Sequence, residues 1–400
     1  MSRRGQLDAV VAGGGVVGAA AALMLAREGL QVALVEAHPP APWRRDDPDL
    51  RVYAFAPDNA ALLDGLDAWT PVLAARAQPY RGMRVWDAGG GQPLVFDADA
   101  LGQRQLGWIV ENALLVDVLW QRLAAVGVRL HCPARIASLA QDADGVRLGL
   151  DDGSTLDTTL AIAADGGAST LRDMAGIDAP RHDYGQQGVV AFVASERPHQ
   201  AHCWQRFLPT GPLALLPFAT GEGDPRAGHL GSIVWTLPDG EARRLLDAEP
   251  GAFERALAQA FGGELGACAL QSRRVGFPLQ RQLADTYVAG RVLLLGDAAH
   301  RVHPLAGQGV NLGLRDVAAL QALVRQAKAT GADLAAPSRL ARWARTRKSE
   351  NAVNAHAFEA INRAYSNDAL LPTLLRGHAL GLAGRLPPLA RALWRHAAGV

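Results

Sequence analysis

Residues 296–313, GDAAHRVHPLAGQGVNLG, combine residue types that could do chemistry in several ways. The stretch contains four glycines, two histidines and an aspartate, and it directly follows the apolar run RVLLL. Such a loop could hold a metal ion, a phosphate group, a catalytic histidine, or a ligand that requires bare backbone more than side chains. The other residues in the loop decide between these possibilities.

A metal site is the first possibility to test. His300 and His303 lie three positions apart, and Asp297 is the only further ligand type in the loop. A structural zinc site takes four nitrogen, sulfur or carboxylate ligands, so this set is incomplete. We therefore predict no metal site, and we expect both histidines to pack within the loop or to flank a bound ligand.

A second glycine cluster lies near the N-terminus. Gly13, Gly15 and Gly18 form G-x-G-x-x-G between the apolar run LDAVVA and a predicted helix, and Glu36 ends the next apolar run, QVALVE. In this arrangement the first glycine permits a tight turn, the second lets backbone approach a pyrophosphate, and the third lets helix pack on strand. The acid can accept hydrogen bonds from a ribose diol. The motif predicts a dinucleotide site, but NAD and FAD both satisfy it.

Two acidic turns decide in favour of FAD. Asp297 follows a predicted strand, where open α/β sheets bind ligands, and its loop is too long and too acidic for a pyrophosphate. Its carboxylate suits the hydroxyls of a ribitol chain, and the helix start near Gly309 could stabilise negative charge on a reduced flavin. Asp165 and Gly166 follow a third predicted strand and could reach the same cofactor from the other side.

Composition excludes other classes of protein. The 400 residues have a formal net charge of +1, which gives no field that would favour nucleic acid. The three cysteines form no close pair, as in a reducing compartment. Asp8 interrupts the N-terminal apolar run, so we do not expect a secretion signal. These features predict a cytoplasmic protein with no nucleic-acid partner.

The glycine motif, the Asp165 turn and the 296–313 loop, in this order, resemble the class A flavoprotein aromatic hydroxylases of the para-hydroxybenzoate hydroxylase type. Several phrases are similar to the ubiquinone-biosynthesis hydroxylases within that class. They are DLRVYAF (49–55), YRGMRVWD (80–87), GWIVEN (107–112), GPLALLP (211–217), SIVWTL (232–237) and HPLAGQGVNLG (303–313). Among subgroups, YRGMRVWD and SIVWTL are most similar to the 2-polyprenylphenol hydroxylases.

The resemblance implies which residues hold the cofactor. The ADP half would lie on the first glycine motif and Glu36, and the pyrophosphate near Arg51. Asp165, Gly296 and Asp297 would follow the ribitol. The flavin ring would meet Pro304 on the substrate side and Gly307, Gly309 and Asn311 at its pyrimidine edge, which makes Pro304, Gly309 and Asn311 the candidate catalytic positions.

The resemblance also implies an α/β architecture in three parts. We expect a discontinuous Rossmann-like FAD-binding domain over residues 1–75, 100–180 and 285–335. A β-sheet substrate domain would take 76–99 and 181–284, with strands at VVAFVAS, CWQRFL, PLALLPF and SIVWTL. Residues 336–400 would form a C-terminal helical region.

The implied reaction is hydroxylation of a polyprenylphenol ring with NAD(P)H and O₂, through a flavin C4a-hydroperoxide. No second glycine motif follows a strand, so NAD(P)H would bind transiently. Two alternatives stay open: a hydroxylase of a small soluble aromatic compound, which would use Arg206 to bind a carboxylate, and a non-catalytic FAD-bearing subunit of a membrane-associated assembly. The acid-free segment 369–400 has two interpretations. It could form a helical hairpin packed on the flavin domain, or it could make peripheral contact with the inner face of the membrane or with a partner in a multi-enzyme complex.

Overall fold

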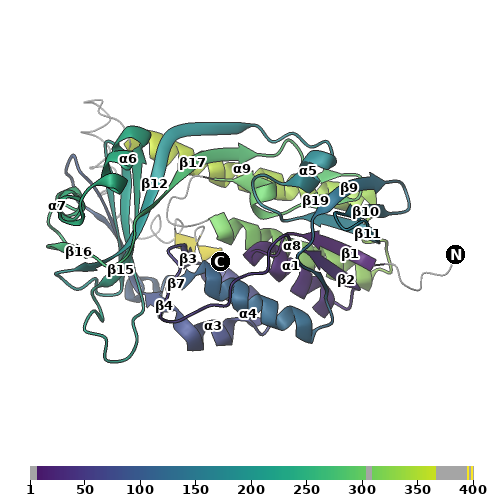
Figure 1. The fold of residues 1–400 in the computed structure, drawn as a ribbon, viewed down its shortest axis with the longest axis horizontal. Coiled ribbons are helices and arrows are strands. Elements are labelled where there is room, and N and C mark those ends of the chain that lie inside the picture. Colours follow the sequence, from purple (N-terminus) through teal and green to yellow (C-terminus); the bar gives the residue numbers. More distant parts are fainter. Residues whose placement is uncertain (1–6, 303–308, 366–393, 396–397, 400) are drawn as a thin grey trace.

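The computed structural model describes residues 7–302, 309–365, 394–395 and 398–399. Two large sheets stand side by side, and a small sheet lies at their junction (Figure 1). His303, Pro304, Gly307 and most of the segment 369–400 lie outside the described residues.

The first sheet has the strand order β18-β19-β11-β1-β2-β8, and β10 and β9 extend it from β11. Its centre is parallel, and residues 9–12 of β1 are all buried because helices and strands cover both faces. The predicted strand–helix–strand unit is confirmed. The strands are β1 (Leu7–Ala12), β2 (Val32–Val35), β8 (Arg129–His131), β9 (Ile136–Gln141), β10 (Val146–Leu150), β11 (Thr155–Ala163), β18 (Val288–Ala289) and β19 (Val292–Leu294).

Helix α1 is buried along most of its length between α4 and α8. Its run of alanines and leucines from Gly18 to Leu25 is apolar all round, as a helix enclosed by protein requires. Helix α9 packs on α8 and extends toward the second sheet (Figure 1). The helices are α1 (Val16–Arg27), α2 (Pro57–Asp64), α3 (Trp69–Arg76), α4 (Asn112–Ala125), α5 (Thr170–Met174), α6 (Asp239–Asp247), α7 (Pro250–Ala260), α8 (Gly309–Ala329) and α9 (Pro337–Tyr365), with short turns η1 (Asp99–Leu101) and η2 (Gly296–Ala298).

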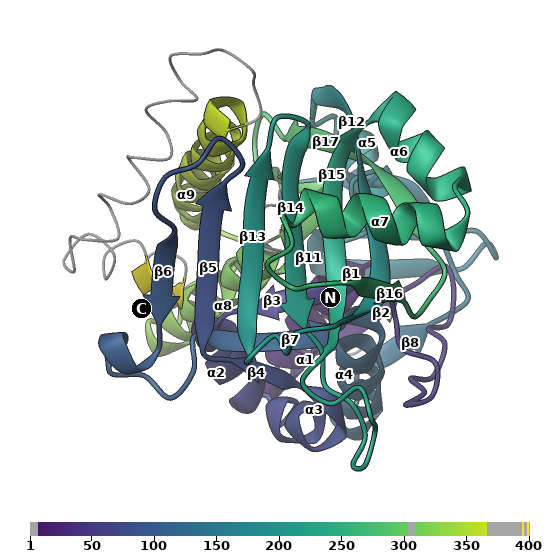
Figure 2. The same cartoon turned by 90° about the vertical axis from the view of Figure 1, so that its left-hand side faces the viewer.

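The second sheet has the order β20-β17-β12-β15-β14-β13-β5-β6, with β16 beside β12. The four strands predicted between residues 181 and 284 are confirmed as β12 to β15. Helices α6 and α7 cover one face of this sheet (Figure 2). The strands are β5 (Gly82–Asp87), β6 (Leu94–Asp97), β12 (Arg181–Ser195), β13 (His202–Leu208), β14 (Gly211–Pro217), β15 (Leu230–Pro238), β16 (Cys268–Leu270), β17 (Val275–Leu283) and β20 (His300–Arg301).

The third sheet joins β3 (Val52–Phe55), β7 (Gly107–Glu111) and β4 (Gln78–Tyr80) between the two larger ones (Figure 1). At the other end of the chain, Trp394 packs against an apolar cluster that includes residues of this sheet, and Ala398 is buried. These last described residues therefore lie on the protein itself. Within the part of the chain that the structure describes, no helix has the length and apolar character needed to cross a bilayer.

Candidate active site

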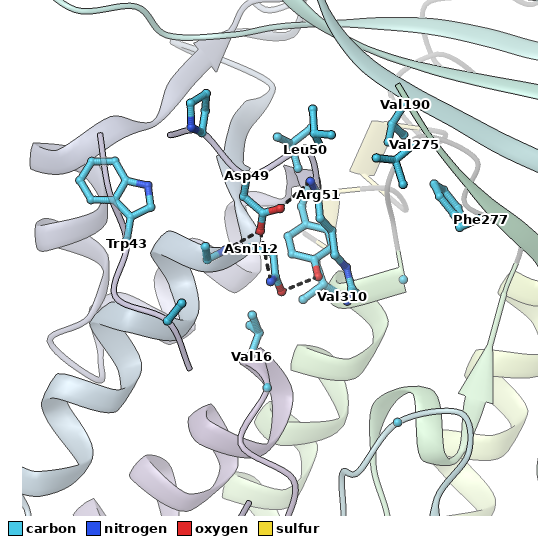
Figure 3. Close-up of a pocket in the computed structure, with 18 of the residues that line it drawn as sticks. Val16, Trp43, Asp49, Leu50, Arg51, Asn112, Val190, Val275, Phe277 and Val310 are labelled. Carbon is cyan, nitrogen blue, oxygen red and sulfur yellow. Dashed lines mark hydrogen bonds between the residues drawn. The ribbon is translucent and has the colours of Figure 1, made fainter. Parts of the chain in front are cut away.

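A cavity of about 1990 Å³ lies between the first and second sheets. One side is formed by the ends of β1 and β11 and the turns that follow them, and the other by the uncovered face of β12, β15 and β17 (Figure 3). Gly13, Gly15, Glu36, Asp165 and Asp297 all line it, although they come from three distant parts of the sequence. The fold thus brings both glycine clusters to one site.

The three glycines of the first motif meet different steric demands. Gly13 has φ +99°, and a Cβ there would lie 2.6 Å from the carbonyl carbon of Ala164. A Cβ on Gly18 would lie 3.2 Å from the Cβ of Ala164 and collide with the Gly13 carbonyl, so helix and strand could not approach as they do. A Cβ on Gly15 would meet no protein atom within 4 Å. Gly15 therefore leaves open space toward the cavity, as a bound pyrophosphate requires.

Glu36 stabilises the glycine loop directly. Its Oε2 accepts a 2.6 Å hydrogen bond from the Gly14 amide, and its Oε1 accepts one of 3.0 Å from the His38 amide. The Trp120 indole donates to the Gly14 carbonyl at 2.7 Å. Both polar groups of the Gly14 backbone are therefore held, while Glu36 still borders the cavity where a ribose is expected.

Two aspartates follow strands of the first sheet. Oδ2 of Asp165 accepts a 3.2 Å hydrogen bond from the Leu171 amide at the start of α5, whereas its Oδ1 is buried without a partner among the described residues. A buried oxygen without a donor is costly, and a ligand hydroxyl would satisfy it. Asp297 lies in η2 directly after β19 and also borders the cavity. Both positions suit the hydroxyl groups of a ribitol chain.

Arg51 extends into the same cavity from the start of β3 (Figure 3). Its guanidinium lies over the ring of Tyr53, 5.5 Å from the centroid. The pKa of Arg51 is raised, first by the adjacent Tyr53 and then by the carboxylate of Asp297. A permanent positive charge therefore lies within the electrostatic reach of Asp297, where it could also attract a pyrophosphate.

A strap formed by residues 43–51 closes one edge of the cavity and is anchored by Glu111. The buried carboxylate of Glu111 accepts hydrogen bonds from the Trp43 indole at 3.1 Å and the Asp49 amide at 2.8 Å, and Arg76 Nε lies 2.8 Å from it. In the sequence, Glu111 stands out only as a member of the phrase GWIVEN (107–112), and nothing there indicates its role as an anchor. Burial raises the pKa of Glu111, and Arg76 opposes that shift.

Asn311 was expected to line the pyrimidine edge of the flavin, and its side chain points away from the cavity. The amide is buried and does not border the cavity. Its Nδ2 donates to the Ala54 carbonyl at 2.8 Å, and its Oδ1 accepts from the Ala56 amide and from Asn59. It links α8 to β3 and α2 instead. Gly309, at the helix start, does border the cavity, and a Cβ there would meet open space.

His300, one of the two histidines tested for metal binding, is buried behind the Asp297 turn. Its Nε2 lies 2.6 Å from the carboxylate of Asp316, and its ring stacks on Tyr287. Among the described residues, no group of three or more His, Cys, Asp or Glu side chains is arranged to hold a metal ion. Asp316 was missed by sequence reasoning.

The strands of the second sheet offer the cavity mostly apolar side chains, and Gln280 of β17 and Arg301 of β20 are polar residues that also line it. In β12, alternate residues face opposite sides, so Val189 and Val193 pack under α6 and α7 while Val190 and Phe192 face the cavity. Further lining side chains are Leu216, Phe218, Val234, Val275, Phe277 and Leu279. This wall offers an apolar surface to a substrate.

Arg206 does not lie on that wall. It is not among the residues that line the cavity, and its Nη1 donates to the carbonyls of Gln259 and Ala260 at the end of α7. The expected use of Arg206 by a hydroxylase of small aromatic acids is therefore wrong. The alternation of β13 turned this side chain toward the helices, where it satisfies helix carbonyls.

Comparisons with known proteins agree with this geometry. The FAD binding domain family model matches residues 6–348. Ubiquinone hydroxylase UbiL of Rhodospirillum rubrum is 36% identical, with 98% of this chain and 89% of the relative covered. The 3-demethoxyubiquinol 3-hydroxylase of Escherichia coli is 34% identical, with 98% of both covered. The mitochondrial ubiquinone biosynthesis monooxygenase COQ6 of Homo sapiens is 33% identical, with 96% of this chain and 90% of the relative covered.

Solved structures share the fold at lower identity. The p-nitrophenol 4-monooxygenase PnpA of Pseudomonas putida has a TM-score of 0.78 at 19% identity, with 98% of both chains covered. HpxO of Klebsiella pneumoniae, in complex with FAD and uric acid, has a TM-score of 0.75 at 21% identity, with 98% of this chain and 97% of that one covered. The predicted α/β fold and the predicted cofactor FAD are confirmed. Because the family model spans most of the chain and relatives above 30% identity cover nearly all of it, this chain belongs to the FAD-dependent monooxygenases, in the family of ubiquinone-biosynthesis hydroxylases.

Proposed function

We propose that this monooxygenase hydroxylates the aromatic ring of a polyprenylphenol intermediate of ubiquinone biosynthesis. The observation that supports this substrate class best is the apolar wall of β12, β14, β15 and β17, which faces the glycine motifs across one cavity. An apolar wall favours a lipophilic ring and tail because burying them removes apolar surface from water. The similarity of YRGMRVWD and SIVWTL to the 2-polyprenylphenol hydroxylases favours the first ring hydroxylation after decarboxylation.

In this proposal different residues around the cavity bind different parts of FAD. Gly13, Gly15, Gly18 and Glu36 hold the ADP half, Arg51 attracts the pyrophosphate, and Asp165 and Asp297 bind the ribitol. The amide groups at the start of α8, near Gly309, face the pyrimidine edge of the flavin. Bound FAD supplies hydride acceptance and O₂ activation, and the protein orients the phenol and excludes water.

The same proposal gives the sheets different roles, in flavin binding and in substrate binding. The first and third sheets with their helices, close to residues 1–75, 100–180 and 285–335, form the flavin-binding part. The second sheet, over residues 82–97 and 181–283, forms the substrate wall. Arg206, the arginine expected to bind the carboxylate of a small aromatic acid, does not line the cavity, whereas Arg273 and Arg301 do. The apolar side chains of β12, β14 and β15 therefore carry the preference for a lipophilic phenol.

The test is NADPH oxidation by the FAD-loaded protein with a short-chain prenylphenol, compared with 4-hydroxybenzoate. We expect the prenylphenol alone to stimulate oxidation, and ¹⁸O from ¹⁸O₂ to appear in the hydroxylated product. Stimulation by 4-hydroxybenzoate but not by the prenylphenol would contradict the proposal. Mass spectrometry of the quinone intermediates that accumulate in a deletion strain would then identify the ring position.

We also propose that the protein works as a peripheral protein at the inner face of the cytoplasmic membrane, since a polyprenyl substrate partitions into the bilayer. Sedimentation of the whole protein with vesicles containing anionic lipid tests this. Binding should weaken with added salt if the contact is electrostatic. Absence of co-sedimentation at low salt would contradict it.

A further inference from the structure

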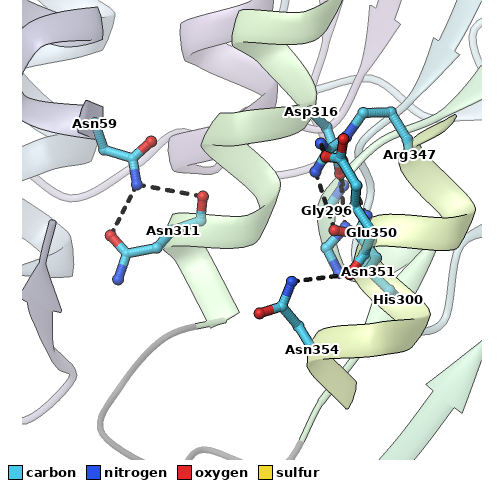
Figure 4. Close-up of polar contacts among 9 residues, drawn as sticks. All are labelled: Asn59, Gly296, His300, Asn311, Asp316, Arg347, Glu350, Asn351 and Asn354. Carbon is cyan, nitrogen blue, oxygen red and sulfur yellow. Dashed lines mark hydrogen bonds and ion pairs between the residues drawn. The ribbon is translucent and has the colours of Figure 1, made fainter. Parts of the chain in front are cut away.

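Asp316 lies in the second turn of α8 and is fully buried. A buried carboxylate is costly unless several donors compensate it, so its partners indicate what it does. Oδ2 accepts hydrogen bonds from the Gly296 amide at 3.0 Å and from His300 Nε2 at 2.6 Å. Oδ1 accepts from Arg347 Nε at 2.8 Å and Asn351 Nδ2 at 3.0 Å (Figure 4).

The first two partners bracket Asp297. Gly296 directly precedes it, with φ +57°, and His300 follows three residues later. One carboxylate oxygen thus fixes both ends of the turn whose middle borders the cavity. His300 is buried and does not border the cavity, so its contact with Asp316 acts on the shape of the turn.

The other two partners come from α9. Arg347 and Asn351 lie one turn apart, and Arg347 Nη2 also donates to Asn351 Oδ1 at 3.0 Å. Four donors therefore surround the four lone-pair positions of one carboxylate. Burial alone would raise the pKa of Asp316, but the pairings with His300 and Arg347 leave it below the usual value. The carboxylate is ionised at neutral pH, as a four-donor acceptor must be.

We infer that Asp316 is a positioning residue of the flavin site, which holds the Gly296–His300 turn so that Asp297 meets the ribitol, and that α9 holds Asp316 in turn. The inference rests on the proposed ribitol contact of Asp297. It gives the C-terminal helix a part in cofactor binding although Arg347 and Asn351 do not line the cavity.

A double-mutant cycle on the FAD dissociation constant tests this, with quenching of flavin fluorescence as the readout. Asp316→Asn should weaken binding about 10-fold, because an amide cannot accept all four donors. Asp297→Ala should weaken it by a similar factor. If Asp316 acts through Asp297, the double variant should bind about as weakly as either single variant, because coupled residues are not additive.

Two controls separate positioning from general loss of structure. Asp316→Asn combined with Glu36→Gln, at the ADP end, should weaken binding by the product of the two factors. Arg315→Gln removes the neighbouring α8 side chain, which pairs with Asp58. Any change that it causes in the FAD dissociation constant should be the same factor with and without Asp297→Ala. Two results would overturn the inference. One is a double variant of Asp316 and Asp297 whose FAD dissociation constant rises by the product of the two single factors, and the other is an unchanged dissociation constant in Asp316→Asn.

If Asp316→Asn does not fold, Asn351→Ala takes its place in the cycle. It removes one donor from outside the cavity, so we expect about 3-fold weaker binding that disappears in the Asp297→Ala background. An unchanged affinity, or a factor that persists in that background, would overturn the inference. If the protein shows this coupling but does not turn over a prenylphenol, the proposed substrate is wrong. The role of Asp316 in FAD binding would still hold.

Discussion

Among single residues, Gly15 gives the most direct test of the cofactor site. Because a Cβ at this position meets no protein atom, Gly15→Val should fold normally and place its side chain in the space of the pyrophosphate. We expect the purified variant to lose the yellow colour and the FAD of the parent protein. Gly240→Val is the control, since a Cβ there also meets open space but lies on α6. Full flavin content in Gly15→Val would contradict the assignment.

His199 provides a residue-scale prediction about pH. It is 3% exposed, and burial, followed by the charges of His229 and His202, lowers its pKa from 6.5 to about 4. As the pH falls from 6.5, the unfolded chain gains a proton that the folded chain does not bind until about pH 4. Stability should therefore be lost across this window, by on the order of 3 kcal/mol at 1.36 kcal/mol per pKa unit.

The measurement is urea unfolding of the FAD-loaded protein at several pH values between 7 and 4. In His199→Gln this part of the pH dependence should be absent, whereas His182→Gln, at an exposed position, should retain it. A slope that is identical in all three proteins would show that His199 does not titrate in this way.

Among elements, the 43–51 strap depends on the pair formed by Glu111 and Arg76, whose side chains are 0% and 8% exposed. Glu111→Leu should destabilise the protein by about 3–5 kcal/mol, because it leaves a buried cation without its partner. The double change Glu111→Leu and Arg76→Met should recover the part of that loss that comes from the unpaired cation, but not the hydrogen bonds of Trp43 and Asp49. Chemical denaturation of the three variants measures both effects, and a double variant no more stable than Glu111→Leu would contradict this account.

The features that could be predicted from the sequence are those determined by a few neighbouring residues. The spacing of Gly13, Gly15 and Gly18 follows from the geometry of one turn, so it identified the dinucleotide site without knowledge of the rest of the fold. The orientations of Asn311 and Arg206 could not be predicted in the same way, because they depend on which neighbours pack on each face of α8 and β13. Asp316 did leave a signal, since it lies four residues from the apolar Leu312 and Leu320, on the buried stripe of its helix.

Across the whole molecule, the cavity has a flavin side and a substrate side, and changes on the two sides should have different effects. Phe277 lies on β17 of the second sheet and lines the cavity from the substrate side. Phe277→Ala should raise the KM for a prenylphenol about 10-fold, since it removes apolar contact area, and should leave the FAD dissociation constant unchanged. Arg206→Gln, on the opposite face of the sheet, should leave both constants unchanged. A large loss of FAD affinity in Phe277→Ala would contradict this division.

The contacts of Asp316 with α9 also set an order of events during biosynthesis. A nascent chain emerges from its N-terminus, so the glycine motif and Glu36 are available early, and β19 can join the parallel sheet only after some 290 residues have been made. Asp316 obtains its last two donors only once residues 347 and 351 have left the ribosome. The chain should therefore acquire its full affinity for FAD only after α9 has been made, and ribosome-bound chains that end before α9 should bind FAD weakly.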